Sequence, residues 1–165
     1  MIKFAITDDI NCNVQNHWKL FVNQEINDKI FLGFMAFKVL SNTEDSTQIV
    51  RKVQCSPTAK LPEPVATFVG ANFNFVESGR LDKSTNVWTY SQTPSAFADQ
   101  LKVYGTVEAV STGTNTVRRT ANVVVEANVF GIGGAIEAFM QAQWTAAWQA
   151  GATFTNKWIA DGNPI

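Results

Sequence analysis

Charged residues are scarce in this chain of 165 residues, at 16% of the sequence against about 25% in an average soluble domain. Lysine and arginine together number 13, aspartate and glutamate number 14, and the formal net charge is −1. Because no basic excess is available to neutralise phosphates, the composition argues against a nucleic-acid-binding protein that works through bulk charge.

Histidine and cysteine are almost absent. The single histidine is His17, and the two cysteines, Cys12 and Cys55, match no zinc or redox spacing. We therefore expect no metal, no cofactor and no catalytic residue. Helical spacing places His17 beside the polar Asn13, which predicts a surface histidine. Cys55 alternates in phase with Ile49, which predicts a small core residue, and unpaired cysteines suit a reduced, cytoplasmic protein.

Targeting signals and long apolar runs are also missing. Residues 1–9 lack the apolar core of a signal peptide. The longest uncharged stretch, residues 138–156, carries several Gln and Thr side chains, which predict an amphipathic helix rather than a membrane span. No lysine or arginine cluster accompanies it, so we expect at most transient membrane contact.

Large apolar rings, in contrast, are abundant. Aromatic residues make up 12% of the chain, among them 12 Phe and 5 Trp, and hydrophobic residues make up 45%. A chain of this length buries roughly 70% of its unfolded surface. One domain over residues 1–165 can therefore build a core without a disulfide or a metal ion.

Alternating apolar and polar residues predict seven strands, over residues 2–10, 37–42, 47–56, 72–79, 85–92, 101–110 and 116–129. Helical spacing predicts a helix after Asn11 or Asn13, a second near residues 24–32, a helical turn over 64–68, and a long helix from Gly134 to about Ala160. Runs of strands joined by short turns indicate the α+β class. We expect a curved seven-stranded antiparallel sheet around the long C-terminal helix, with two short helices between the first two strands.

Three stretches carry a resemblance to known proteins: LPEPV (61–65) leading to VGANF (69–73), the hairpin over residues 77–88, and VFGIGGAIE (129–137). On these motifs the chain resembles the START-like, or Bet v 1-like (SRPBCC), helix-grip superfamily along nearly its whole length. It is most similar to a bacterial START-like family of unknown function. The glycine-containing stretch also resembles the corresponding turn of PRELI-type phospholipid-transfer proteins.

This resemblance implies a cavity between the sheet and the last helix. The superfamily includes lipid-transfer proteins, hormone receptors, aromatase/cyclase enzymes and hydrolase activators, and the fold does not choose among them. We expect non-catalytic binding or transport of a small-to-medium hydrophobic ligand such as a lipid, sterol or polyketide. One alternative is a cyclase/aromatase-like enzyme that uses a cavity carboxylate or tyrosine, Tyr90 or Tyr104, although Tyr104 is expected to face outward. Another is an interaction module with a solid core.

Inward strand positions and the apolar arc of the last helix supply the expected cavity lining: Phe73, Phe75, Val103, Arg119, Ala121, Val123, Val125, Met140, Trp144, Trp148 and Phe154. Apolar residues at loop ends, which this fold gathers at one mouth, form the expected gate: Phe34, Met35, Phe68, Phe97, Phe130 and Ile132. The same loop residues could instead contact a membrane or each pack into its own corner.

Arg119 alternates in phase with Val117 and Ala121, which places a cation on the apolar face of the last strand. In the helix-grip fold the first and last strands pair, which brings Asp8 close to Arg119. We expect a buried ion pair, with Glu77 as a second partner, because a buried charge needs a counterion. The alternatives are a ligand contact or a bulge that turns Arg119 outward.

Small residues line the back of the long helix, at positions 135, 138, 142, 146 and 150. A charge-free alanine stripe would let a second helix approach closely, so a homodimer through the Ala135–Ala150 face is one interpretation. The high helix propensity of alanine is the other.

Overall fold

The computed structural model describes residues 1–32, 35–58, 63, 66–67 and 73–165. The chain begins with β1 (Ile2–Ile10), α1 (Val14–Val22) and α2 (Gln24–Ile30). Six strands follow: β2 (Met35–Glu44), β3 (Gln48–Pro57), β4 (Phe75–Asp82), β5 (Val87–Pro94), β6 (Leu101–Gly113) and β7 (Thr116–Ala127). The chain then forms the long helix α4 (Gly133–Ala160).

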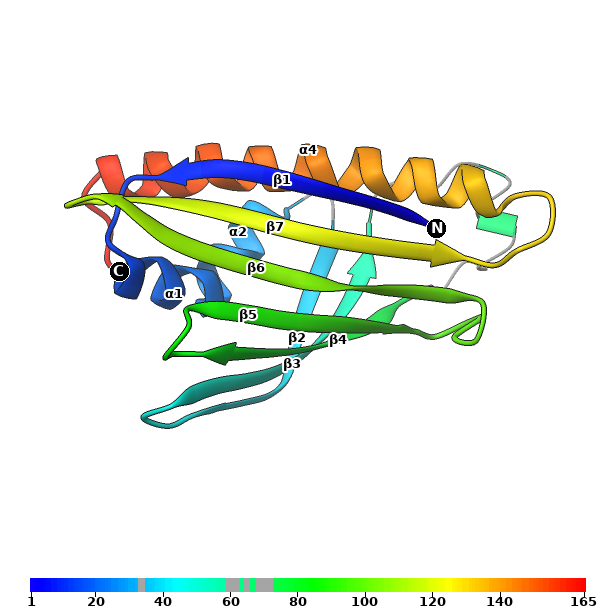
Figure 1. The fold of residues 1–165 in the computed structure, drawn as a ribbon, viewed down its shortest axis with the longest axis horizontal. Coiled ribbons are helices and arrows are strands. Elements are labelled where there is room, and N and C mark those ends of the chain that lie inside the picture. Colours follow the sequence, from blue (N-terminus) through cyan, green and yellow to red (C-terminus); the bar gives the residue numbers. More distant parts are fainter. Residues whose placement is uncertain (33–34, 59–62, 64–65, 68–72) are drawn as a thin grey trace.

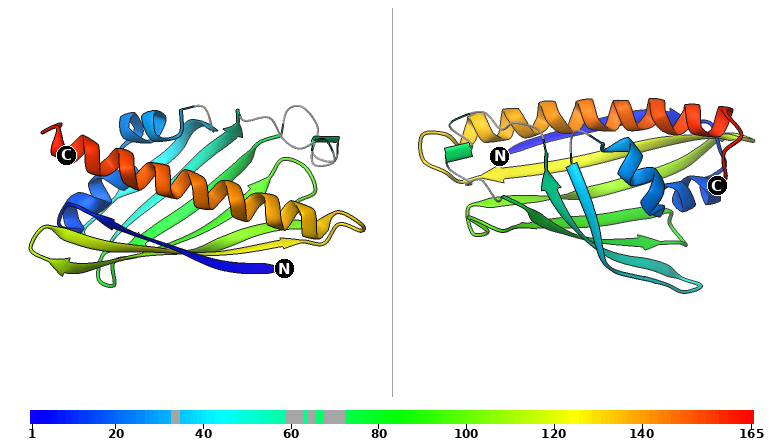
Figure 2. Two further views of the ribbon diagram at one scale, coloured as in Figure 1. Left: turned by 90° about the horizontal axis from the view of Figure 1, so that it is seen from above. Right: turned by 180° about the vertical axis from the view of Figure 1, so that it is seen from behind.

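The strands form one antiparallel sheet in the order β1-β7-β6-β5-β4-β3-β2. Figure 1 shows α4 running along β1 and β7, while the sheet curves away beneath it and the two short helices cover one end. Figure 2 shows the same arrangement from above and from behind. The predicted α+β class, the seven-stranded curved sheet and the order of the helices are confirmed.

Asparagine side chains set the ends of the two short helices. Asn13 precedes α1 and its Oδ1 accepts a hydrogen bond from the Asn16 amide at 2.8 Å. Asn23 ends α1 and begins α2, where its Oδ1 accepts from the Ile26 amide at 3.1 Å. Such caps satisfy amide groups that have no partner within the helix. The turn between the helices is therefore built from one residue that serves both.

The β4–β5 hairpin differs from the sequence prediction. Its strands were expected at 72–79 and 85–92, whereas β4 continues to Asp82 and β5 begins at Val87. The charged residues Arg80 and Asp82 suggested a turn, but they occupy the outward positions on either side of the buried Leu81. The turn lies after them and is completed by Asn86 at φ 56°, a conformation that asparagine tolerates. The helical turn predicted over residues 64–68 lies largely outside the described residues.

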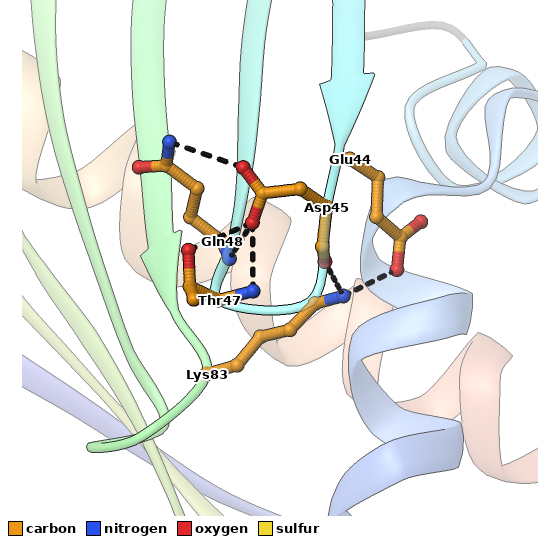
Figure 3. Close-up of polar contacts among 5 residues, drawn as sticks. All are labelled: Glu44, Asp45, Thr47, Gln48 and Lys83. Atoms are coloured by element: carbon orange, nitrogen blue, oxygen red, sulfur yellow. Dashed lines mark hydrogen bonds and ion pairs between the residues drawn. The ribbon is translucent and has the colours of Figure 1, made fainter.

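The tips of two hairpins are joined by polar contacts (Figure 3). Asp45, between β2 and β3, accepts hydrogen bonds from the amide and hydroxyl of Thr47, both at 2.7 Å, and from the Gln48 amide at 2.9 Å. These bonds lower the pKa of Asp45 to about 2. Lys83, from the β4–β5 turn, contacts Glu44 at 2.7 Å. An aspartate that bonds amides just after it in sequence fixes the turn and with it the strand register.

Among the helices that the structure describes, none is both long enough and apolar enough to cross a membrane.

Candidate ligand cavity

A cavity of about 220 Å³ lies between α4, the inner face of the sheet and the two short helices. Seven of the predicted lining residues border it: Phe73, Phe75, Val103, Arg119, Met140, Trp144 and Trp148. The interior is therefore not a solid core.

Four predicted lining residues do not border the cavity. Ala121, Val123 and Val125 are buried on β7, in clusters that include α4 side chains packed directly against the sheet. Phe154 does not border the cavity, although Gly151 and Thr155 on the same helix do, and its ring packs against the cluster that contains Ile10. In the sequence these positions alternate in the same way as the residues that border the cavity. The alternation predicts which side chains point inward, but it does not predict where α4 and the sheet move apart.

The predicted gate residues that the structure describes lie in different surroundings. Met35 borders the cavity, whereas Phe97, Phe130 and Ile132 do not. The loops that carry Phe97 and Phe130 lie at the same end of the sheet (Figure 1), and both side chains are exposed. Ile132 instead packs against the cluster that contains Ile136. The remaining two predicted gate residues, Phe34 and Phe68, lie outside the described residues.

Three aromatic rings that border the cavity follow one another with nearly parallel planes. Tyr90 of β5 and Trp144 of α4 have centroids 5.8 Å apart with 16° between their planes. Trp144 and Trp148 are 6.5 Å apart at 17°. The guanidinium of Arg119 lies 4.4 Å from the centroid of the Trp148 ring, within the range of a cation–π contact.

Two glycines make room for the rings on the sheet. A Cβ on Gly79 would overlap the ring of Trp88, which lies across β4. A Cβ on Gly105 would overlap the carbonyl oxygen of Asn122 and lie 2.8 Å from the Tyr90 hydroxyl. Each glycine thus allows a large side chain from the neighbouring strand to lie flat over the sheet.

Arg119 is paired with Asp8. The two residues are opposite each other in the β1–β7 register, and Arg119 Nη2 lies 2.7 Å from Asp8 Oδ2. The side chains are 9% and 11% exposed. Arg119 Nη2 also donates to the carbonyl of Trp148 at 3.3 Å. Burial lowers the pKa of Arg119, and the hydrogen bond to Asp8 opposes that shift.

Glu77 was expected beside Arg119, and this expectation is wrong. Strands β5 and β6 lie between them, and the Glu77 carboxyl instead accepts a hydrogen bond from Gln92 at 3.0 Å. Burial raises the pKa of Glu77, while Gln92 and the charge of Arg51 oppose that shift. Arg51 Nη1 donates to the carbonyl of Val22, at the end of α1, at 3.0 Å. Besides Arg119 and its partner, the cavity therefore has a second cluster of polar side chains, which consists of Arg51 on β3, Glu77 on β4 and Gln92 on β5.

His17 is buried rather than on the surface, with 3% of the residue exposed, and it borders the cavity. Its ring lies 4.8 Å from that of Trp18. Helix α1 closes one end of the cavity and buries the consecutive residues His17 and Trp18. The buried face of α1 is therefore wider than the one that helical spacing predicted. Burial, with a smaller contribution from the charge of Arg119, lowers the pKa of His17 to about 3. The imidazole is therefore neutral at pH 7.

Sequence reasoning missed several cavity residues. Arg51 and Gln92 lie in phase with Ile49 and Trp88, so the alternation that identified Arg119 would also have found them. On α4, Gln143 borders the cavity beside Trp144, although it looks like a solvent residue in the sequence. Tyr104 faces outward as predicted, and its hydroxyl donates to Glu126 at 2.7 Å.

Five cavity residues have a buried polar atom without a hydrogen-bond partner in the part of the chain that the structure describes: His17 Nε2, Arg51 Nε, Trp88 Nε1, Tyr90 Oη and Arg119 Nε. Buried polar atoms are nearly always paired in proteins. Unpaired donors and acceptors on a cavity wall are suited to bind water or polar atoms of a ligand.

The described residues contain no group of three or more His, Cys, Asp or Glu side chains placed to hold a metal ion. The stripe of small residues on the back of α4, Ala135 to Ala150, is exposed in the single chain.

The architecture matches solved structures of low sequence identity. A Thermus thermophilus protein, TTHA0849, superposes with a TM-score of 0.70 at 10% identity, over 99% of this chain and 100% of that one. The Zhui aromatase/cyclase of a Streptomyces species gives 0.68 at 14% identity, over 99% of both chains. Norcoclaurine synthase of Thalictrum flavum gives 0.67 at 10% identity, over 99% of this chain and 90% of that one. These likenesses show the helix-grip fold.

No curated protein matches the sequence. A family model does match, over residues 6–159, and it describes a protein of unknown function, DUF2505. The chain therefore belongs to the DUF2505 family, and its fold is that of the START-like, Bet v 1-like helix-grip superfamily.

Proposed function

We propose that the protein binds a small hydrophobic ligand in this cavity without covalent chemistry, and that it carries, shields or senses that ligand. The observation that supports this is an interior space of about 220 Å³ with aromatic and aliphatic walls and a few polar groups. Such spaces are the usual form of a small-molecule site.

The size of the cavity favours a small ligand over a sterol or a two-chain lipid. Pockets for drug-sized molecules measure about 300–1,000 Å³, and this one is below that range. The structural neighbours point the same way, because the norcoclaurine synthase structure holds dopamine and hydroxybenzaldehyde, both small aromatic molecules. We therefore favour a ligand of about the size of two fused aromatic rings.

A cyclase-like enzyme is the second candidate. Its support is that Glu77 and Tyr90 both border the cavity. Burial raises the pKa of the Glu77 carboxyl, and a raised pKa suits a carboxyl group that acts as a proton donor. Burial also raises the pKa of Tyr90, which keeps its hydroxyl protonated.

The test of ligand binding is native mass spectrometry of the purified protein, followed by calorimetric titration with 2-acetylnaphthalene. Ala147 borders the cavity, so Ala147→Phe is expected to weaken binding at least about tenfold by filling the space. Its neighbour Ala146 is exposed on the back of α4, and Ala146→Phe serves as the matched control. An empty protein that binds no member of a small aromatic panel and gains no thermal stability from it contradicts the proposal.

The same material separates carrier from enzyme. A carried ligand is recovered unchanged after incubation with excess protein, whereas a substrate is recovered as product. In the second case Glu77→Gln would abolish conversion and leave binding intact.

A further inference from the structure

We propose that Arg51 forms an anion-binding end of the cavity and that the ligand is a small hydrophobic acid whose carboxylate this guanidinium holds. The inference rests on the proposed ligand-binding function and specifies the chemical class of ligand.

Arg51 is a buried cation without a direct counterion. It points to the inner face of β3 between Ile49 and Val53, and only 6% of the residue is exposed. None of the ion pairs within the described ranges includes Arg51. Its hydrogen bond to the neutral carbonyl of Val22 uses one of five N–H donors, and its buried Nε has no partner in the described chain.

Comparison with Arg119 shows that the guanidinium of Arg51 lacks a counterion. Both arginines border the cavity and both have an unpaired Nε. Arg119, however, has a carboxylate at 2.7 Å and an aromatic ring against its guanidinium. The charge of Arg119 is therefore compensated within the protein, and Arg51 is the arginine left to bind an external anion.

Glu77 is the acid that acts on Arg51, but only at a distance. The two residues are on adjacent strands, and they interact through their charges without a contact of 4.0 Å or less. The Glu77 carboxyl is held by Gln92 instead. Burial favours the neutral form of Glu77, and a neutral Glu77 would leave the charge of Arg51 uncompensated.

A purely structural role for Arg51 explains less. Anchoring the end of α1 through Val22 needs one donor and no charge, whereas burying an uncompensated charge is costly. A guanidinium is matched to a carboxylate, which it can bind through two parallel N–H donors. The apolar walls would then enclose the hydrophobic body of the same molecule.

The test compares two probes of nearly equal shape, 2-naphthoate and the uncharged 2-acetylnaphthalene, by isothermal titration calorimetry at pH 7. The wild-type protein is expected to bind naphthoate at least about tenfold more tightly, the gain of one charge-assisted hydrogen bond. Arg51→Gln removes the charge and keeps a polar side chain, and it is expected to remove that preference and leave binding of the ketone within about twofold. Arg118→Gln makes the same charge change at an exposed position and is expected to keep the preference.

The outcomes separate the two proposals. Equal affinity for both probes, or a preference that survives in Arg51→Gln, overturns the anion site and leaves the hydrophobic cavity function intact. Failure of both probes to bind overturns both proposals. If Arg51→Gln does not fold, the Nε–H resonance of Arg51 in the wild type decides: it should shift on addition of naphthoate and not of the ketone, and an unmoved resonance overturns the inference.

Discussion

Arg119 and Asp8 face each other across the β1–β7 pair, with Nη2 and Oδ2 2.7 Å apart beneath α4. The next register position holds the same residue types, Arg118 and Asp9, with Nε and Oδ1 3.0 Å apart on the outer face. Two neighbouring ion pairs of the same residue types therefore differ in burial, and the buried one has added contacts with Trp148, so the exposed pair serves as its control.

Removal of the buried arginine should be far more costly than removal of the exposed one. Arg119→Met leaves Asp8 as a buried charge without its partner, and such losses amount to about 3–5 kcal/mol. Arg118→Met breaks an exposed pair, for which about 0–1 kcal/mol is typical. Urea unfolding of both variants measures the two free energies. Equal losses would contradict the difference in burial.

His17 should make the protein less stable in mild acid. The unfolded histidine binds a proton below about pH 6.5, whereas burial in the folded state lowers its pKa to about 3. Because the unfolded state binds more protons between these values, the free energy of unfolding falls as the pH falls from 6.5 to 3. The slope is at most about 1.4 kcal/mol per pH unit.

The measurement is urea unfolding of the wild type and His17→Leu between pH 4 and pH 7. The difference between the two curves isolates the contribution of His17. Glu77, whose raised pKa changes stability in the opposite direction, is present in both proteins and its contribution cancels. Stability contributed by Glu77 is present at low pH and is lost as the pH rises through its folded pKa. Parallel curves for the two proteins would show that His17 can be protonated in the folded state.

The sequence was sufficient for the fold because the signals there are local. Alternation and helical spacing depend on residues a few positions apart, and they gave the bounds of β1 as residues 2–10 without error. The cavity depends on where α4 separates from the sheet, which no local pattern encodes. Val123 and Val103 therefore look alike in the sequence, although only Val103 borders the cavity. Arg51 differs from these residues, since its alternation with Ile49 and Val53 is a local signal that does indicate an inward position.

Gly79 should be intolerant of any side chain. A Cβ at this position would overlap the ring of Trp88, which is fully buried and cannot move without opening the core. Gly79→Ala is therefore expected to destabilise the protein by about 1–3 kcal/mol through overpacking. Gly134 in the first turn of α4 is the matched control, because a Cβ there meets nothing within 4 Å.

The control substitution, Gly134→Ala, is expected to be neutral or to stabilise by up to about 1 kcal/mol, since alanine is the better helix former. Thermal unfolding and tryptophan fluorescence report on both variants. An unchanged melting temperature in Gly79→Ala would mean that Trp88 has room that the structure does not show.

Cys55 should report on cavity occupancy, with Cys12 as the reference thiol. Both are buried: burial raises the pKa of Cys12 to about 11, and burial with the charge of Glu77 raises that of Cys55. Because the thiolate is the reactive form, the native protein should react slowly with a disulfide reagent at pH 8, and the unfolded protein rapidly.

Cys55 borders the cavity and Cys12 does not. In Cys12→Ser, 2-acetylnaphthalene should therefore slow the labelling of Cys55 more than it slows the labelling of Cys12 in Cys55→Ser. Equal slowing would mean that both thiols react only through global unfolding, and that the bound probe does not cover Cys55.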